Sequence, residues 1–126
     1  DISYKELEDL LKESDFVSLN VPLTKSTEKL IGEKELKIMK PTAYLINTSR
    51  GEIIDEDALL EFLLKGHIAG VALDVFSNEP PVTETEKKIL SLDNVISTPH
   101  IGAQTKESLH LESKEAAEII INFFKK

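Results

Sequence analysis

The sequence predicts an α/β fold: a three-layer arrangement in which a mainly parallel sheet of about four strands carries helices on both faces. Two observations support this prediction. Helix-like and strand-like segments alternate along the chain, which is the pattern of parallel sheets with helical crossovers. Three apolar runs also end in polar turns that carry Arg50, Glu79 or His100. Ligands bind beyond the carboxyl ends of parallel strands, so these three turns are candidates for one site.

The first elements are a short helix and a strand. Ser3 is expected to cap a helix that ends near Ser14, and Glu6 would complete a capping box. The apolar segment Phe16–Asn20 is expected to be the first strand, and it stops before Pro22.

The middle of the chain continues the alternation. A helix is expected after Gly32, ending before Pro41, and a short buried strand at Ala43–Asn47. Asp55 is the expected N-cap of the next helix, and Gly66 lies near its C-terminal end.

The last elements contain the most hydrophobic segment, Ile68–Val75, which is expected to be a central strand. A short helix near Thr85–Leu90, a short strand at Val95–Ser97 and a long final helix that begins at Thr105 are expected to follow. The apolar faces of the helices are interpreted as core. In the final helix the apolar positions include Leu109, Ala116, Ile120, Phe123 and Phe124.

The composition restricts the classes of function. A chain of 126 residues is expected to form one domain, residues 1–126. Its net charge is −8 and it has no basic run, which argues against nucleic-acid and membrane partners. It has no cysteine and no His/Asp/Glu set with metal-ligand spacing, so no metal is expected. The default expectation for its location is the cytoplasm.

The three turn residues suggest acid–base chemistry on an anion. Arg50 is the single arginine of the chain, and its planar fork suits a carboxylate. An acid and a histidine nearby would complete an acid–base centre. From pattern alone, Arg50 could instead cap carbonyl groups, and Glu79 could be an ordinary loop carboxylate. Asp74, at an apolar strand end, would either cap a neighbouring backbone or meet a ligand.

A glycine-rich phosphate-binding turn is missing. The five glycines do not form Gly-x-Gly-x-x-Gly, and no Gly-Lys-Ser/Thr loop is present. The chain therefore looks like the second half of a larger α/β domain.

Four motifs resemble the NAD-dependent D-isomer-specific 2-hydroxyacid dehydrogenases. They are Asp-Phe-Val-Ser-Leu-Asn-Val-Pro-Leu-Thr at 15–24, Ile-Asn-Thr-Ser-Arg-Gly at 46–51, Ala-Leu-Asp-Val-Phe-x-x-Glu-Pro-Pro at 72–81 and Thr-Pro-His-Ile-Gly-Ala at 98–103. The last of these, extended to Thr105, looks closest to phosphoglycerate dehydrogenases. The resemblance implies a partial Rossmann-like domain.

The resemblance also implies roles for individual residues. Arg50 would bind the substrate carboxylate, and His100 would exchange a proton with the 2-hydroxy or 2-keto oxygen. Glu79 would orient His100 and favour its protonated form. The residues expected to line the NAD cofactor are Asn20, Val21, Pro22, Thr48, Asp74 and Gly102.

The leading hypothesis is the catalytic half of an oxidoreductase that interconverts a D-2-hydroxy acid, 3-phosphoglycerate being one candidate, and its 2-keto acid. The alternatives are a folding module without turnover and a dinucleotide sensor. Alone, the chain is expected to be inactive and to bind NAD weakly or not at all, because the pyrophosphate-binding turn is absent.

The position of the first strand is a further expectation. By analogy with the family, Phe16–Asn20 would be a strand whose neighbours are missing. It is therefore expected to move and pair in parallel with Ala43–Asn47, with the helix Glu33–Met39 as crossover. A homodimer that covers the exposed edge is the alternative.

Overall fold

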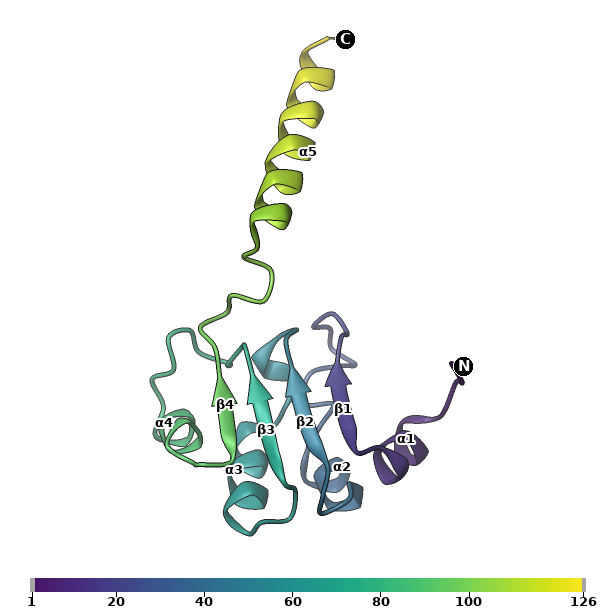
Figure 1. Cartoon of the computed structure of the whole chain (residues 1–126), viewed down its shortest axis with the longest axis vertical. Coiled ribbons are helices and arrows are strands. Elements are labelled where there is room, and N and C mark those ends of the chain that lie inside the picture. The colour runs from purple at the N-terminus through teal and green to yellow at the C-terminus, as the bar shows by residue number, and fades with distance from the viewer. Residues whose placement is uncertain (1, 126) are drawn as a thin grey trace.

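The protein forms one open parallel sheet with helices (Figure 1). The structure, a computed structural model, describes residues 2–125. The strands are β1 (Phe16–Leu19), β2 (Tyr44–Asn47), β3 (Gly70–Leu73) and β4 (Val95–Ser97), and they lie in the order β1-β2-β3-β4, all parallel. The α/β class and the sheet of four strands are thus confirmed. β1 pairs with β2 as expected, and the connection between them contains α2.

The helices alternate with the strands. They are α1 (Leu7–Glu13), α2 (Glu33–Ile38), α3 (Glu56–Leu64), α4 (Glu84–Leu90) and α5 (Lys106–Phe124), and a 3₁₀ turn, η1 (Gly51–Ile53), follows β2. The core lies between the sheet and the layer of helices α1 to α4. On the sheet side it is built from Val17, Leu19, Leu45, Val71 and Leu73.

The expected helices on both faces are not found among the described residues. The strands alternate buried and exposed positions, and the exposed set includes Phe16, Tyr44 and Ile96. Phe16 and Tyr44 stack on this open face, with ring centroids 5.6 Å apart. The reason is topological: the strands follow one another in a single direction, and right-handed crossovers then place every connecting helix on the same face.

Most of the expected helix ends are confirmed. The Asp55 carboxylate accepts a hydrogen bond from the Ala58 amide at 3.3 Å and begins α3, while Gly66 follows it with a φ of +63°. The Thr105 hydroxyl caps α5. The capping box predicted at Ser3 is wrong, because α1 begins after Glu6, whose side chain makes no cap hydrogen bond.

Helix α5 stands away from the sheet (Figure 1). None of its residues is buried, which corrects the interpretation of its apolar face as core. Its exposed apolar side chains are Leu109, Leu111, Ile119, Ile120, Ile121, Phe123 and Phe124. Within residues 2–125, neither α5 nor any other helix has the length and hydrophobicity needed to cross a bilayer.

Deleting residues 106–126 should leave the folded body intact. We expect the free energy of unfolding to change by less than about 1 kcal/mol, because α5 contributes nothing to the core. Urea unfolding of the shortened and complete chains measures this. Leu11→Ala, at a fully buried position, is the positive control and should cost about 2–5 kcal/mol. A comparable loss on deleting α5 would mean that the helix packs against the body in solution.

Candidate functional site

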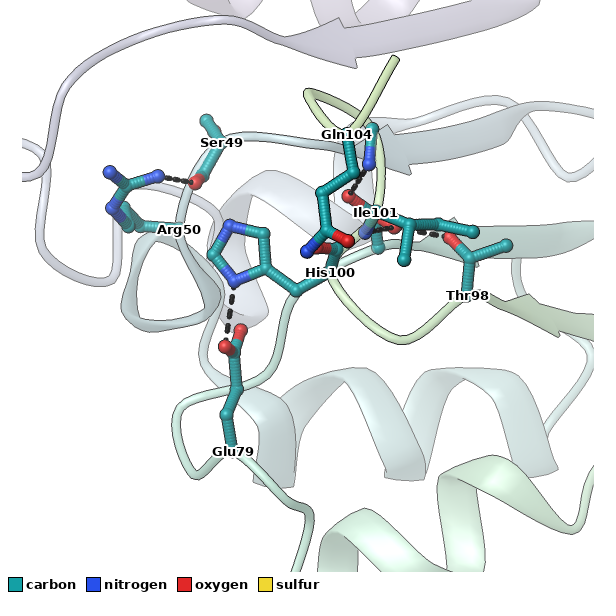
Figure 2. Close-up of polar contacts among 9 residues, drawn as sticks. Ser49, Arg50, Glu79, Thr98, His100, Ile101 and Gln104 are labelled. Carbon is teal, nitrogen blue, oxygen red and sulfur yellow. Dashed lines mark hydrogen bonds and ion pairs between the residues drawn. The ribbon is translucent and has the colours of Figure 1, made fainter. Parts of the chain in front are cut away.

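Arg50, Glu79 and His100 all follow carboxyl ends of the parallel sheet. They come after β2, β3 and β4 respectively, so they lie at one edge. His100 Nδ1 is 2.7 Å from Glu79 Oε2, and both side chains remain about two-fifths exposed, at 44% and 42%. Because an ionised carboxylate can only accept, Nδ1 is the donor in this bond. Nε2 is therefore the ring nitrogen left to exchange a proton with a ligand (Figure 2).

The backbone of His100 has an unusual conformation. Its φ is +52°, in the left-handed region that few residues other than glycine adopt. The His100 amide donates to the carbonyl oxygens of Asp74 at 2.8 Å and Thr98 at 3.1 Å, and the Gln104 side chain donates to the His100 carbonyl at 3.2 Å. Strained positions of this kind concentrate at functional sites, where the surrounding structure fixes them.

Asp74 holds the turn that carries His100. Its carboxylate, only 6% exposed, accepts from the Thr98 hydroxyl, from the Ile101 amide at 3.0 Å and from the Gly102 amide at 2.8 Å. Burial alone would raise the pKa of Asp74, but these hydrogen bonds outweigh it and the pKa is lowered. Asp74 thus caps a neighbouring backbone, as one of the two interpretations from sequence expected. Its contact with a ligand stays a prediction.

Asn47 holds the turn that carries Arg50. Its fully buried side chain donates to the Arg50 carbonyl at 2.8 Å and accepts from the Ser49 amide at 3.0 Å and hydroxyl at 2.9 Å. The exposed Arg50 guanidinium donates to the Ser49 carbonyl at 2.6 Å. Sequence reasoning gave Asn47 no role, although a polar residue inside an apolar strand signals a buried hydrogen-bonding function.

The other predicted cofactor residues lie at the same edge. Asn20 and Pro22 follow β1 and Thr48 follows β2, and all three are exposed. Val21 packs partly against the core. At Gly102 an added Cβ would lie 2.9 Å from Asp74 Oδ2, so a larger residue would displace this carboxylate. Their role as cofactor ligands stays a prediction.

A cavity of about 420 Å³ opens beside the Glu79–His100 pair. Its walls are formed by Asp74, Phe76, Glu79, Pro80, Pro81, Leu90, Ser97, Thr98, Pro99 and His100. Arg50 is not among these residues. The described residues contain no cluster of three or more His, Asp or Glu that could hold a metal ion.

Glu86 is a buried acid that sequence reasoning missed. Its carboxylate accepts from the amides of Asn78, Val82 and Thr83 and from the Asn78 side chain, at 2.8 to 2.9 Å. Burial raises its pKa, but these donors dominate and lower it to about 2. Glu86 stands three residues after Thr83, and this capping-box spacing was the available signal.

This lowered pKa predicts acid sensitivity. A carboxylate with a pKa near 4.5 when unfolded and about 2 when folded stabilises the fold fully above pH 4.5 and loses that contribution as pH falls toward 2. The free-energy gap between the wild type and Glu86→Gln should therefore shrink between pH about 7 and about 3 in urea titrations. Glu84→Gln, an exposed change in the same helical turn, should show little gap at either pH. A gap independent of pH would refute the assignment.

The fold and site together define an α/β domain that presents a hydrogen-bonded Glu79–His100 pair at the edge where parallel sheets bind their ligands. Comparison with known proteins specifies the family. Residues 1–102 match the family model of the D-isomer specific 2-hydroxyacid dehydrogenase, NAD binding domain. The chain therefore belongs to this family, as part of its NAD-binding domain.

Similar proteins agree with this assignment. The chain is 52% identical over 122 residues to a glyoxylate reductase of Thermococcus litoralis, covering 97% of this chain and 36% of the relative. It is 45% identical over 124 residues to a hydroxypyruvate reductase of Thermotoga maritima, covering 98% and 40%. A D-lactate dehydrogenase of Aquifex aeolicus, crystallised with NAD and lactic acid, matches with a TM-score of 0.91 and 40% identity, covering 98% of this chain and 41% of that one.

These comparisons bear on two expectations. The chain spans well under half the length of these relatives, yet it superposes over 98% of its length on the dehydrogenase. The β1–β2 pairing is thus the family arrangement, and no strand has moved to fill a gap. The relatives are also named as glyoxylate and hydroxypyruvate reductases, which gives no support to 3-phosphoglycerate as the substrate.

Proposed function

We propose that the chain supplies the catalytic half of the cofactor domain of an NAD-dependent oxidoreductase. The parent enzyme interconverts a small 2-hydroxy acid, of D configuration where C2 is a stereocentre, and its 2-oxo acid, such as hydroxypyruvate or glyoxylate. The observation that carries the proposal is the 2.7 Å bond between Glu79 and His100 at the carboxyl edge of the sheet. The similarity of this chain to relatives named for these substrates supports the substrate class.

Each residue has a defined task in this proposal. Arg50 grips the substrate carboxylate through its fork. Glu79 accepts from Nδ1, which fixes the imidazole so that Nε2 gives its proton to the keto oxygen during reduction. The nicotinamide supplies the hydride when bound, and the protein supplies position and charge. Asn20, Val21, Pro22, Thr48, Asp74 and Gly102 are the residues proposed to line the cofactor, and they lie at the ends of β1 to β4.

The single arginine accounts for one carboxylate of the substrate. Among residues 2–125 at the carboxyl edge, Arg50 is the one arginine, so one carboxylate is the anion that the site can pair bidentately. The open sheet face and α5 are surfaces that the rest of the parent chain would cover. The proposed partner of this chain is therefore the remaining part of a dehydrogenase.

A chimera tests the proposal. The matching 122-residue stretch of the Thermococcus litoralis glyoxylate reductase is replaced by the aligned part of this chain. NADH consumption is then followed with glyoxylate and with hydroxypyruvate. We expect turnover of at least one of these acids. A folded chimera that binds NADH but consumes none with either acid would reject the function and favour a module without turnover.

A further inference from the structure

The segment Ser77–Thr83 carries Glu79 to His100, and its backbone donors are held almost entirely by two acids. The Ser77 amide donates to Glu56 at 2.8 Å. The amides of Asn78, Val82 and Thr83 donate to Glu86. Two prolines, at positions 80 and 81, have no amide proton. The amide of Glu79 is thus the single backbone donor of this segment not bound by Glu56 or Glu86.

The contacts of Glu86 exceed what a helix cap requires. In a capping box the amide of the N-cap residue donates one hydrogen bond to the acid in the helix. Here the Thr83 amide donates to Glu86. Glu86 makes three further bonds, to the Val82 amide and to the backbone and side chain of Asn78. These partners lie on both sides of Glu79, so one buried carboxylate fastens the loop before and after the residue that contacts His100.

Glu79 depends on this backbone because its own side chain is not packed. Its carboxylate is 42% exposed and contacts His100 at 2.7 Å. Glu86, by contrast, is 0% exposed and keeps its place within the fold. Because both residues belong to one short stretch of chain, the buried Glu86 carboxylate determines where the exposed Glu79 side chain lies.

We propose that Glu86 is a positioning residue, whose buried carboxylate holds the Ser77–Thr83 loop so that Glu79 stays bonded to His100 Nδ1. Asp74 performs the matching task on the other side, since it holds the turn that carries His100. Each member of the pair thus has its own buried acid. The importance of this arrangement for turnover rests on the proposed function, whereas the arrangement itself is tested without turnover.

The test reads the imidazole directly in the 126-residue chain. Long-range ¹H–¹⁵N NMR spectra show which ring nitrogen carries the proton when they are recorded about two pH units above ~6.5, the ordinary pKa of histidine. In the wild type we expect His100 to carry it on Nδ1. His67 Nε2 is 3.1 Å from the Lys37 carbonyl and is the internal reference with the opposite tautomer. His110 is exposed on α5 and shows the ratio of the two tautomers expected for a histidine in solvent.

Glu86→Gln should shift His100 from the Nδ1–H form to the mixture shown by His110. Glutamine replaces one acceptor oxygen by an NH₂ group, which would face the N–H groups that Glu86 binds. Thr83→Val is the matched control: it removes the hydroxyl that accepts from the Glu86 amide but keeps the loop bonds. It should weaken the start of α4 and leave the His100 tautomer unchanged. His67 should remain unchanged in both variants.

A second variant covers failure of Glu86→Gln to fold. Asn78→Asp, at an exposed position, sets a carboxylate against Glu86 and should produce the same shift at His100. If the folded variants among these two keep the wild-type His100 tautomer, the proposal is overturned. If the tautomer shifts as expected but the chimera has no turnover, the positioning stands and the proposed function fails.

Discussion

Replacing His100 by Asn should reduce kcat/KM of the chimera for glyoxylate by about 10²–10⁴, the usual contribution of general acid–base catalysis. Asparagine suits this test because it tolerates the left-handed backbone, with a φ of +52°, that His100 adopts. It can donate a hydrogen bond but cannot transfer a proton at neutral pH. The change therefore separates proton transfer from backbone strain and from loss of a polar contact. Initial rates of NADH oxidation measure it.

His67→Asn is the matched control. His67 lies outside the carboxyl edge, with its Nε2 near the Lys37 carbonyl and its ring against Phe62. We expect kcat/KM to stay within about threefold of the parent chimera, with a small loss of stability. Near-normal turnover in His100→Asn would remove His100 from the proton-donor role, whatever the stability of the variant.

Gly51→Ala should destabilise the chain by about 3–5 kcal/mol, or prevent folding. A Cβ at Gly51 would lie 2.0 Å from the Phe76 carbonyl carbon and 2.2 Å from the Ser77 nitrogen. These are backbone atoms, so no rotamer change relieves the overlap. The glycine allows the turn after β2 to touch the backbone after β3, which brings the segments of Arg50 and Glu79 together.

Gly66→Ala is the comparison that isolates this overlap. Gly66 has a φ of +63° and open space around it, so alanine there costs only backbone strain, about 1 kcal/mol. Chemical unfolding should give Gly51→Ala a much lower free energy of unfolding than Gly66→Ala. Equal losses would show that the backbone at Gly51 is not in close contact with Phe76 and Ser77.

Local patterns predicted most of the elements because each has a physical signal near in sequence. The caps Asp55 and Thr105 and the strand Val95–Ser97 were expected from residue type and periodicity. Ile68–Val75 was expected as one long strand, but the ladder covers only Gly70–Leu73. Ile68 and Val75, at its two ends, are buried but lie outside the ladder, and apolar composition alone does not distinguish burial from strand pairing.

The layer arrangement and the fate of α5 depend on information beyond local pattern. Helices were expected on both faces, but strand order decides the face and is not a local property. The apolar stripe of α5 predicts that one face of the helix is buried, but the described residues do not bury it. The identity of the pair members followed from their motifs, whereas the anchoring role of Glu86 required the distances.

The stereochemistry of the reverse reaction tests most directly whether the parent enzyme is a D-2-hydroxyacid dehydrogenase in which Arg50 and His100 orient the substrate. The chimera is given NAD with D-glycerate or L-glycerate, and NADH formation is followed. We expect oxidation of the D-isomer and a rate for the L-isomer at least about 100-fold lower, because in the proposed site Arg50 would hold the carboxylate and His100 the hydroxyl in one orientation toward the nicotinamide. Equal rates for the two isomers, or a preference for the L-isomer, would contradict it.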